Sequence, residues 1–273
     1  MEPRHQKRIL TVQDISCLGQ CSLTVALPIL SACGVEAAII PSAILSTHTG
    51  SWSNFTFRDL TDDLPKITEH WQSYGIKFDA IYTGYIGSAR QFDMINVMKK
   101  TLLRDGAPVI IDPAMADNGR LYTGFDNEYV KGMAEFVRDA DYLLPNITEA
   151  ALITDTEYRE RYGKEYIEKL VYGLVAKGVK NVIITGVSFE PDKIGVCVYD
   201  GQIRYYFEDR LAYSMHGTGD VYSSVFTGAL VGGQDIYSAA ARAAGFTRLA
   251  MMNTPKEHGY GVNFESLLGK LSE

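Results

Sequence analysis

The sequence predicts one α/β domain in which helices cover both faces of a mostly parallel central sheet, a three-layer α/β/α sandwich. Short apolar runs alternate with longer amphipathic runs along the whole chain, as in strands joined by crossover helices. The short runs are almost continuously apolar, which is typical of strands buried on both faces. No low-complexity linker and no repeat divides the 273 residues. A single domain over residues 1–273 is therefore expected.

The first half of the chain alternates three strands with three helices. The strands are expected at residues 8–14, 35–45 and 78–87, and the helices at residues 21–34, 56–75 and 88–106. The first helix closes on Gly34 and contains Pro28, which can kink a helix. In the second helix, Thr61 or Asp62 is the expected N-cap ahead of Pro65.

The second half continues this alternation and adds a hairpin. Strands are expected at residues 107–115, 141–146 and 179–186, and helices at residues 127–140, 164–178, 219–232 and 235–252. A hairpin over residues 194–209 should turn at Asp200 and Gly201, because Asp-Gly favours two-residue hairpin turns. Strands joined by helices imply right-handed crossovers and hence a mostly parallel sheet.

Composition and charge exclude several classes of partner. The net charge is −7 and no basic run is present, so no nucleic acid is expected. No stretch reaches the ~18 apolar residues of a membrane span, and the N-terminal apolar run is too short for a signal-peptide core. The four cysteines lack C-x-x-C spacing and are expected to be free, mostly buried thiols in a reducing cytoplasm, with Cys17 and Cys21 as small packing residues.

Polar residues follow the predicted strands at the edge where ligands bind in such sheets. They are Asp14, His48 with Thr49, Thr83 to Tyr85, Asp112, Asn146 with Glu149, and Thr185 with Gly186. His48 is more often a hydrogen-bonded structural residue than a catalyst, yet "STHTG" lies at this edge. Trp52, Phe55 and Phe57 follow it and either line a pocket or belong to the core.

The segment "HGTGD" (residues 216–220) precedes a predicted helix. Gly217 and Gly219 can turn N–H groups around Thr218 into an anion-binding nest, and the helix dipole adds to it. Asp220 is either a first-turn residue only or a base positioned against a hydroxyl. The small residues that follow would let the helix pack closely on the sheet; they are Ser223, Ser224, Gly228 and Ala229.

Two further segments carry polar side chains with two interpretations each. In "IIDPAMAD", Asp112 and Asp117 are either turn residues or carboxylates near a nucleotide's metal and phosphates. In "LLPNITEAALI", either Thr148 or Asn146 caps a short helix with Glu149 in its first turn, or Asn146 and Glu149 contact water bound to Mg²⁺. Capping fits an Asn followed by Glu three residues later, whereas Mg²⁺ keeps several waters and few direct protein ligands.

Six motifs in this order resemble those of the ribokinase-like superfamily, and within it the pyridoxal kinase group. They are "ILTVQD" with "GQCS", "STHTG", "TGYIGSARQ", "IIDPAMAD", "LLPNITEAALI" and "GTGD". The resemblance covers nearly the whole chain. It implies a kinase that phosphorylates the 5′-hydroxymethyl group of a B6 vitamer with ATP and Mg²⁺, with room for a monovalent cation such as K⁺. It also implies a homodimer.

The resemblance also implies roles for the site residues. Asp220 would be the general base, and Gly217, Thr218 and Gly219 would form the anion hole. The residues that would face the vitamer are Asp14, His48, Thr49 and Tyr85. The residues that would face ATP are Asp112, Asp117, Asn146, Glu149, Thr185 and Gly186, with Mg²⁺ held through water by Asp112, Asn146 and Glu149.

Three departures and two rivals accompany the resemblance. Asp14 stands where pyridoxal kinases commonly have serine, Leu144 where threonine is common, and Ala116 where glycine is usual. Asp14 would favour a protonated ring nitrogen or an amine. Hydroxymethylpyrimidine kinases resemble this chain too, but typically carry cysteine after Gly-Thr-Gly, where this chain has Asp220. The second rival is a binding protein without catalysis, which has no need of a base.

Overall fold

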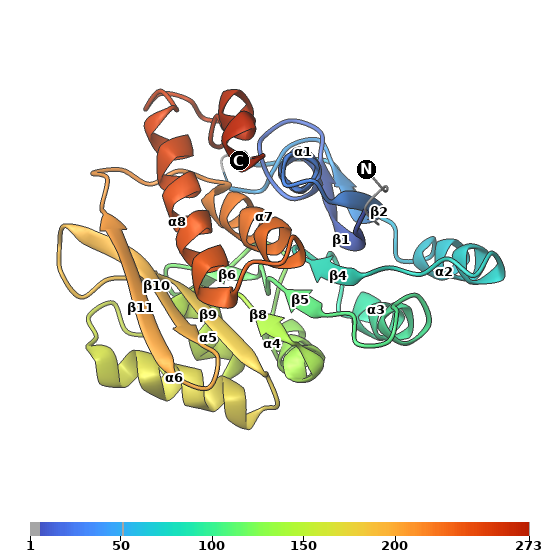
Figure 1. Ribbon diagram of the computed structural model, residues 1–273, viewed down its shortest axis with the longest axis horizontal. Coiled ribbons are helices and arrows are strands. Elements are labelled where there is room, and N and C mark those ends of the chain that lie inside the picture. Colours follow the sequence, from blue (N-terminus) through green and yellow to red (C-terminus); the bar gives the residue numbers. More distant parts are fainter. Residues whose placement is uncertain (1–5, 51, 273) are drawn as a thin grey trace, which may run out of the picture.

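The computed structural model describes residues 6–50 and 52–272; the first part of the N-terminal segment considered above lies outside them. Within these residues, nine strands form one sheet in the order β11-β10-β9-β8-β5-β4-β1-β2-β3 (Figure 1). The strands are β1 (Arg8–Ser16), β2 (Glu36–Leu45), β3 (Phe57–Asp59), β4 (Ala80–Thr83), β5 (Val109–Ile111), β8 (Tyr142–Leu143), β9 (Asn181–Val187), β10 (Lys193–Tyr199) and β11 (Ile203–Asp209). The six central strands from β9 to β2 are parallel, which confirms the expected sheet.

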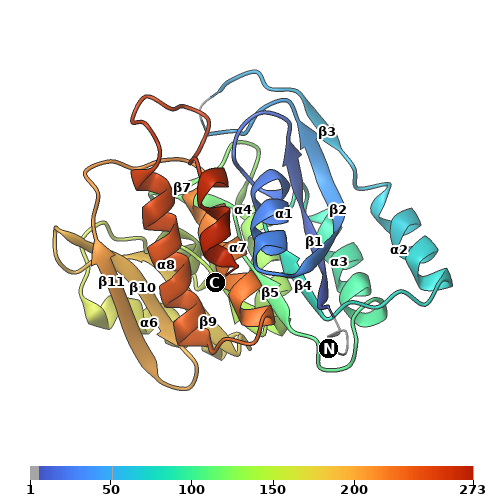
Figure 2. The ribbon, with the colours of Figure 1, turned by 45° about the horizontal axis from the view of Figure 1, so that its top comes forward.

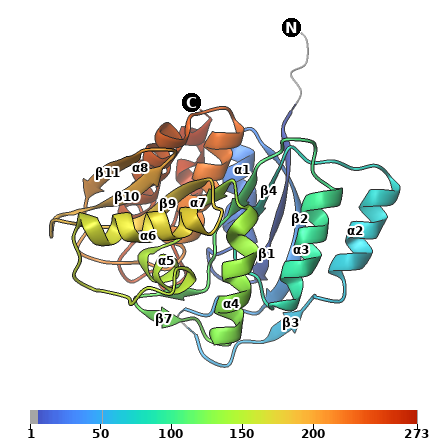
Figure 3. The same ribbon diagram turned by 90° about the horizontal axis from the view of Figure 1, so that it is seen from below.

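Helices cover both faces of the sheet. One face carries α2 (Leu64–Ser73), α3 (Arg90–Thr101), α4 (Asn127–Phe136), α5 (Ile147–Ile153) and α6 (Lys164–Ala176), seen in front in Figure 3. The other face carries α1 (Leu23–Ala32), α7 (Thr218–Val231), α8 (Ile236–Met252) and the 3₁₀ turn η2 (Glu265–Leu271), seen in Figure 2. A second 3₁₀ turn, η1 (Val137–Asp139), extends α4.

Each face of the sheet buries its own apolar cluster. The α2–α6 side packs around residues such as Ile81, Ile111 and Val182, and the α1–α7–α8 side around Ile9, Tyr82 and Ile183. Alternate residues of one strand therefore enter opposite clusters, as the period of a strand requires. This burial on both faces explains why the central strands contain so few charged residues.

The expected hairpin is confirmed. Strands β10 and β11 pair antiparallel, with Tyr199 opposite Ile203. The connection therefore has three residues, Asp200, Gly201 and Gln202, instead of the expected two-residue turn. Gly201 has a φ of 102°, a conformation that glycine tolerates and most residues avoid.

The prediction of a continuous helix over residues 56–75 is wrong. Residues Phe57–Asp59 form the edge strand β3, paired antiparallel with β2. The helix begins only at Leu64, with Asp63 at the N-cap position, so neither Thr61 nor Asp62 caps it. The Thr61 amide and hydroxyl both donate to Asp59 instead. Pairing with β2 therefore overrides the local helical pattern.

A two-stranded hairpin was not foreseen. Strands β6 (Ala116–Asp117) and β7 (Arg120–Leu121) pair directly after Asp112 and Pro113. The turn between them uses Asn118 and Gly119, both with positive φ. Asn-Gly is the strongest short hairpin signal, so the pair Asn118-Gly119 could have predicted this hairpin from the sequence.

Candidate active site

Four carboxylates gather at the carboxyl edge of the parallel strands, facing the start of α7. Asp14 lies near the end of β1, Asp112 directly follows β5, Glu149 lies in the first turn of α5, and Asp220 lies in the first turn of α7. The charges of Asp112 and Asp14 both act on Asp220, and the charge of Asp112 acts on Glu149. The predicted strand-end residues thus share one site.

Asp220 has the properties of a base. Burial, then the charges of Asp112 and Asp14, raises its pKa from 3.8 to about 8. The backbone N–H of Ser22 and the thiol of Cys21 donate hydrogen bonds to it and partly offset that rise. A carboxylate with a pKa near the working pH is well suited to accept a proton.

Asp112 is buried and held by two donors. The Ser223 hydroxyl donates to Asp112 Oδ2 at 2.6 Å, and the Ala114 backbone N–H also donates to it. Burial nevertheless raises the Asp112 pKa from 3.8 to about 6. A negative charge on Asp112 disfavours ionisation of nearby Asp220 and so raises its pKa.

The capping interpretation of Asn146 and Glu149 is confirmed. The Asn146 side chain accepts from the Glu149 N–H at 3.0 Å, and Glu149 Oε2 accepts from the Asn146 N–H at 2.9 Å. Glu149 Oε1 also accepts from the Met115 N–H at 3.0 Å, and Asn146 Nδ2 donates to the Ala116 carbonyl at 2.7 Å. The pair therefore ties the loop after Asp112 to the start of α5.

The predicted anion nest depends on one glycine with a positive φ, not two. Gly217 has a φ of 79°, and an added Cβ would lie 2.1 Å from the Gln20 carbonyl oxygen. Helix α7 begins at Thr218, so Gly219 is already helical, and an added Cβ there would meet no described heavy atom within 4 Å. The expectation that Gly219 needs a conformation closed to other residues is wrong. The N–H groups of the first turn still have no helical partner.

Asp14 and Tyr85 face each other on the predicted vitamer side. Asp14 is buried, accepts from the Ser16 hydroxyl at 3.0 Å and also accepts from the Ser22 hydroxyl. Burial raises its pKa from 3.8 to about 6. Burial, and then the charge of Asp14, raises the pKa of the Tyr85 phenol.

His48 and Trp52 lie beside the nest. The His48 ring is 4.8 Å from Trp52 and 5.4 Å from His216, the residue before Gly217. Trp52 also stacks on Tyr260 at 5.5 Å, so it joins the site, whereas Phe57 lies on β3 with 44% of its side chain exposed. Burial lowers the pKa of His48, and its Nδ1 accepts from the Gly50 N–H at 3.1 Å. Thr49 follows in the same segment.

Asp117, Thr185 and Gly186 lie around this centre. Asp117 is exposed in the β6–β7 hairpin and bonds to Asn118, yet its charge interacts with His216 of the nest loop. The Thr185 N–H donates to the Pro145 carbonyl at 2.9 Å, one residue before Asn146. Gly186 follows in β9 with a φ of 75° and an exposed backbone.

Comparison with known proteins places these motifs in a family. Residues 29–263 match the family model described as phosphomethylpyrimidine kinase. The chain belongs to this family. A protein of Bacteroides thetaiotaomicron, provisionally named a phosphomethylpyrimidine kinase and crystallised with pyridoxal, is 38% identical, with a TM-score of 0.92 over 98% of this chain and 96% of that one.

Other family relatives are named pyridoxal kinases. The crystal structure of pyridoxal kinase from Lactobacillus plantarum has 32% identity and a TM-score of 0.89, covering 97% of this chain and 96% of that one. The pyridoxal kinase of Dictyostelium discoideum is 26% identical over 247 residues, 84% of this chain and 78% of the relative. These likenesses confirm the ribokinase-like fold and the resemblance to B6 kinases.

Sequence reasoning missed four residues of this kinase site. Ser223 was counted as a small packing residue, but its hydroxyl holds Asp112. Cys21 bonds to Asp220 and Cys17 is exposed, so the prediction that both only pack is wrong. Ser22 contacts two carboxylates, and Tyr122 lies among the charges of Glu149, Asp117, Asp112 and Asp220. The i, i+3 spacing of Asp220 and Ser223 on one helix face could have revealed Ser223.

The donor set fits Mg²⁺ bound mainly by phosphates and water. Among the described residues, no three His, Cys, Asp or Glu side chains are grouped to hold a metal ion alone. Asp112 offers one buried carboxylate near Asp220, while Glu149 already accepts three backbone N–H groups. Mg²⁺ in kinases commonly uses one or two carboxylates together with substrate phosphates.

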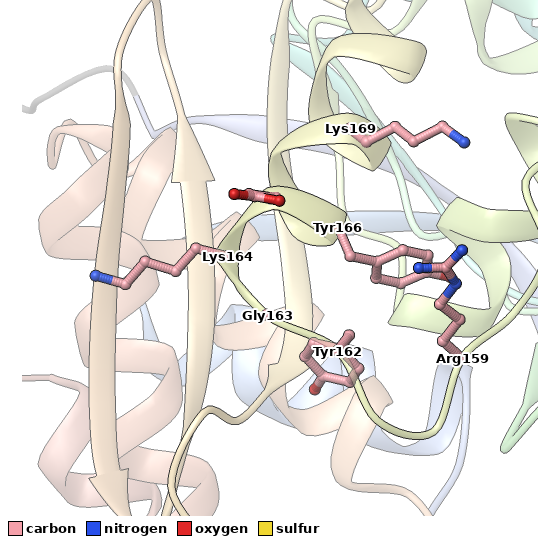
Figure 4. A pocket seen from close by; sticks show the side chains of 7 residues that line it. Arg159, Tyr162, Gly163, Lys164, Tyr166 and Lys169 are labelled. Atoms are coloured by element: carbon pink, nitrogen blue, oxygen red, sulfur yellow. The ribbon is translucent and has the colours of Figure 1, made fainter.

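A separate surface pocket lies at the start of α6 (Figure 4). It has a volume of about 500 Å³ and is lined by Arg159, Tyr162, Gly163, Lys164, Glu165, Tyr166 and Lys169. Figure 4 shows Arg159 beside the Tyr166 ring and Lys164 directed away from both. Tyr162 contacts the Gly186 carbonyl and the Ser188 N–H, so this pocket borders the end of β9. None of the four carboxylates lines it. The described chain contains no helix long and apolar enough to cross a membrane.

Proposed function

We propose that this protein is an ATP-dependent B6 vitamer kinase that phosphorylates the 5′-hydroxymethyl group of pyridoxal, pyridoxine or pyridoxamine. The observation that carries the proposal is Asp220, a buried carboxylate with a pKa of about 8, one turn beyond Gly217 and its positive φ. The pyridoxal bound by the Bacteroides thetaiotaomicron relative supports the choice of substrate.

The reaction needs a base on one side of the transferred group and N–H donors on the other. Asp220 accepts the proton of the 5′-hydroxyl as its oxygen forms a bond to the γ-phosphorus of ATP. The bond between the γ-phosphorus and the oxygen that bridges it to the β-phosphate breaks, and ADP leaves with that oxygen. The N–H groups of Gly217, Thr218 and Gly219 stabilise the charge on the transferred phosphoryl group.

The remaining site residues bind and orient the two substrates. Asp14, His48, Thr49 and Tyr85 face the vitamer ring, and Asp117, Thr185 and Gly186 face the nucleotide. Asp112 would hold Mg²⁺ through water, and Asn146 and Glu149 would contribute indirectly, because their hydrogen bonds fix the loop that follows Asp112. Mg²⁺ would neutralise phosphate charge when bound, and K⁺ is a further candidate cation.

Hydroxymethylpyrimidine kinase activity is the second candidate, because the family model carries a phosphomethylpyrimidine kinase description. Asp220 instead of cysteine after Gly-Thr-Gly favours the B6 vitamer. A binding protein without catalysis would gain nothing from a carboxylate that desolvation and neighbouring charges hold near pKa 8, since such a group destabilises the fold.

A cytoplasmic homodimer completes the proposal. Four free thiols fit a reducing compartment. Strand β3 is an edge of the sheet. Phe57 in this strand is 44% exposed, and Ile44 in the neighbouring strand β2 is 38% exposed. Exposed apolar edges of this kind commonly pair with another chain. Light scattering coupled to size-exclusion chromatography measures the mass of the assembly.

Release of ADP tests the proposed function directly. The protein is incubated with Mg·ATP and, in separate reactions, pyridoxal, pyridoxine, pyridoxamine or hydroxymethylpyrimidine. Turnover with at least one B6 vitamer at a higher kcat/KM than with the pyrimidine is expected. Turnover of the pyrimidine alone would establish the second candidate, and binding without ADP release would establish the non-catalytic one.

A further inference from the structure

Ser22 adopts a conformation that serine normally avoids. Its φ is 52° and its ψ is −128°, a region that is strained for any residue with a Cβ. It is 4% exposed. Its carbonyl starts α1 by accepting from the N–H groups of Val25 and Ala26 at 3.0 and 2.9 Å. The strain therefore lies at the junction between the β1–α1 loop and the helix.

Helix capping does not explain this serine. Ser22 occupies the N-cap position of α1, where serine is favoured because its hydroxyl can accept a helical N–H. In the described structure, however, its side chain makes no capping hydrogen bond. Ser22 has neither a relaxed backbone conformation nor a capping hydrogen bond. Other contacts must therefore explain why a serine stands at this position.

Those contacts go to two carboxylates of the active site. The Ser22 N–H donates to Asp220, and the Ser22 hydroxyl donates to Asp14. One residue thus joins the predicted base to the predicted vitamer-facing carboxylate. Only the hydroxyl requires serine, because glycine would supply the same N–H without strain at this φ.

The loop before Ser22 is held from several sides. An added Cβ on Gly217 or Gly261 would lie 2.1 or 2.9 Å from the Gln20 carbonyl oxygen, and one on Gly19 would lie 2.4 Å from His48. The Gln20 N–H donates to the Tyr260 carbonyl at 2.7 Å. Packing of the neighbouring residues therefore fixes the backbone path of this loop. The Ser22 side chain is not needed to hold that path, so its hydrogen bond is its remaining contribution.

We propose that Ser22 is a positioning residue that fixes Asp14 and Asp220 relative to each other, its N–H orienting the base and its hydroxyl orienting the vitamer-facing carboxylate. This assignment rests on the proposed function. The assignment gives the Ser22 hydroxyl and the Ser22 N–H different roles. Loss of the hydroxyl should disturb vitamer binding, whereas the retained N–H should preserve the phosphoryl-transfer step.

The variants Ser22→Gly and Ser22→Ala test the assignment. Both remove the hydroxyl, but glycine also removes the strain. A hydrogen bond to a buried carboxylate is worth about tenfold or more in affinity. Both variants should therefore raise the KM for the vitamer about tenfold, leave the KM for ATP unchanged and keep kcat within about threefold. The melting temperature of Ser22→Gly should equal or exceed that of the wild type.

The pH profile adds a readout that a purely structural role would not move. Asp14 is faced by Ser16 on its own strand, by Tyr85 after β4, by Cys21 and Ser22 of the loop, and by Asp220 on α7. Removing one donor from Asp14 makes its ionisation harder. The acidic limb of kcat/KM for the vitamer should move to higher pH in both variants.

Asp155→Gly is the matched control, because Asp155 also has a positive φ of 51°, is exposed and follows α5. It should raise the melting temperature without changing either KM. An unchanged vitamer KM and pH profile in both Ser22 variants would overturn the assignment. If the wild type turns over no vitamer, the proposed function fails, and titration of the same variants with pyridoxal without ATP decides the role of Ser22. Absence of pyridoxal binding to the wild type would overturn both.

Discussion

Ser223 Oγ lies 2.6 Å from Asp112 Oδ2, and Ser223 follows Asp220 by three residues on α7. Residues three apart lie on the same face of a helix. Helix α7 therefore presents the proposed base, Asp220, and, one turn later, the donor that holds the neighbouring carboxylate. Burial and then the charge of Asp112 raise the pKa of Asp220, so one helix carries the proposed base and also holds a carboxylate that raises its pKa.

Ser223→Ala should lower kcat/KM for the vitamer about tenfold or more. Asp112 would lose a buried charge-assisted hydrogen bond, worth about 1.5–3 kcal/mol, and its carboxylate would no longer be held beside Asp220. Initial rates of ADP release measure the effect. Ser224→Ala is the control, since that hydroxyl has only a 3.5 Å contact with the Tyr82 hydroxyl. Equal rates for both variants would remove Ser223 from the site.

Asp220→Asn should abolish turnover and stabilise the protein near neutral pH. The folded pKa of Asp220, about 8, lies above the ordinary value of 3.8, so the folded state binds more protons than the unfolded state between these values. The contribution of this group to stability is therefore fully present below about pH 4 and falls as the pH rises toward 8. Loss of a general base lowers kcat at least about 100-fold.

Melting temperatures across pH 4 to 9 check this sign. The difference between Asp220→Asn and the wild type should grow with pH up to about 8 and then level off. Asp235→Asn is the control, because the pKa of that exposed N-cap is lowered by its bond from Ser238, and the substitution should give no such gain. A melting temperature for Asp220→Asn that is at or below that of the wild type at pH 8 would contradict the raised pKa.

Much of the fold was predictable because strands buried on both faces of a parallel sheet have a recognisable apolar sequence pattern. The runs that became β1, β2 and β9 are apolar along most of their length, and only a sheet covered on both faces accommodates them. The wrong helix prediction fell at the edge of the main sheet, where β3 is exposed along its three residues. An exposed strand carries no apolar pattern, so its pairing with β2 could not be read from local sequence.

Sequence reasoning likewise found some residues of the candidate site and missed others. Asp112, Asn146 and Asp220 directly follow strands or begin helices, so topology alone brings them to one edge. Ser22 and Cys21 reach the same edge through a loop whose path depends on contacts with Gly217 and Tyr260. Such contacts join residues about 200 positions apart and leave no periodic trace. Local rules therefore found the carboxylates but not the donors that orient them.

Gly217→Ala and Gly219→Ala should differ sharply in stability. Alanine at position 217 would place its Cβ 2.1 Å from the Gln20 carbonyl oxygen at a φ of 79°, and strain of this kind costs about 1–3 kcal/mol or more. Alanine at position 219 meets no described atom within 4 Å and favours the helix by about 0.5–1 kcal/mol. Thermal unfolding should show a loss of several degrees for the first and none for the second. Equal losses would contradict the helical state of Gly219.

Glu149→Gln separates the structural role of this residue from a role in metal binding. Glu149 accepts from the N–H groups of Asn146, Met115 and Ala116, and an amide would direct its NH₂ group at one of these donors. A buried unsatisfied donor costs about 1–3 kcal/mol. The melting temperature should fall by several degrees, and amide hydrogen exchange at Ala116 should accelerate. Thr148→Val is the control: it removes a bond to the Gly119 N–H in the same loop without changing charge. A variant with wild-type stability but a raised Mg²⁺ requirement would show instead that Glu149 acts on the metal.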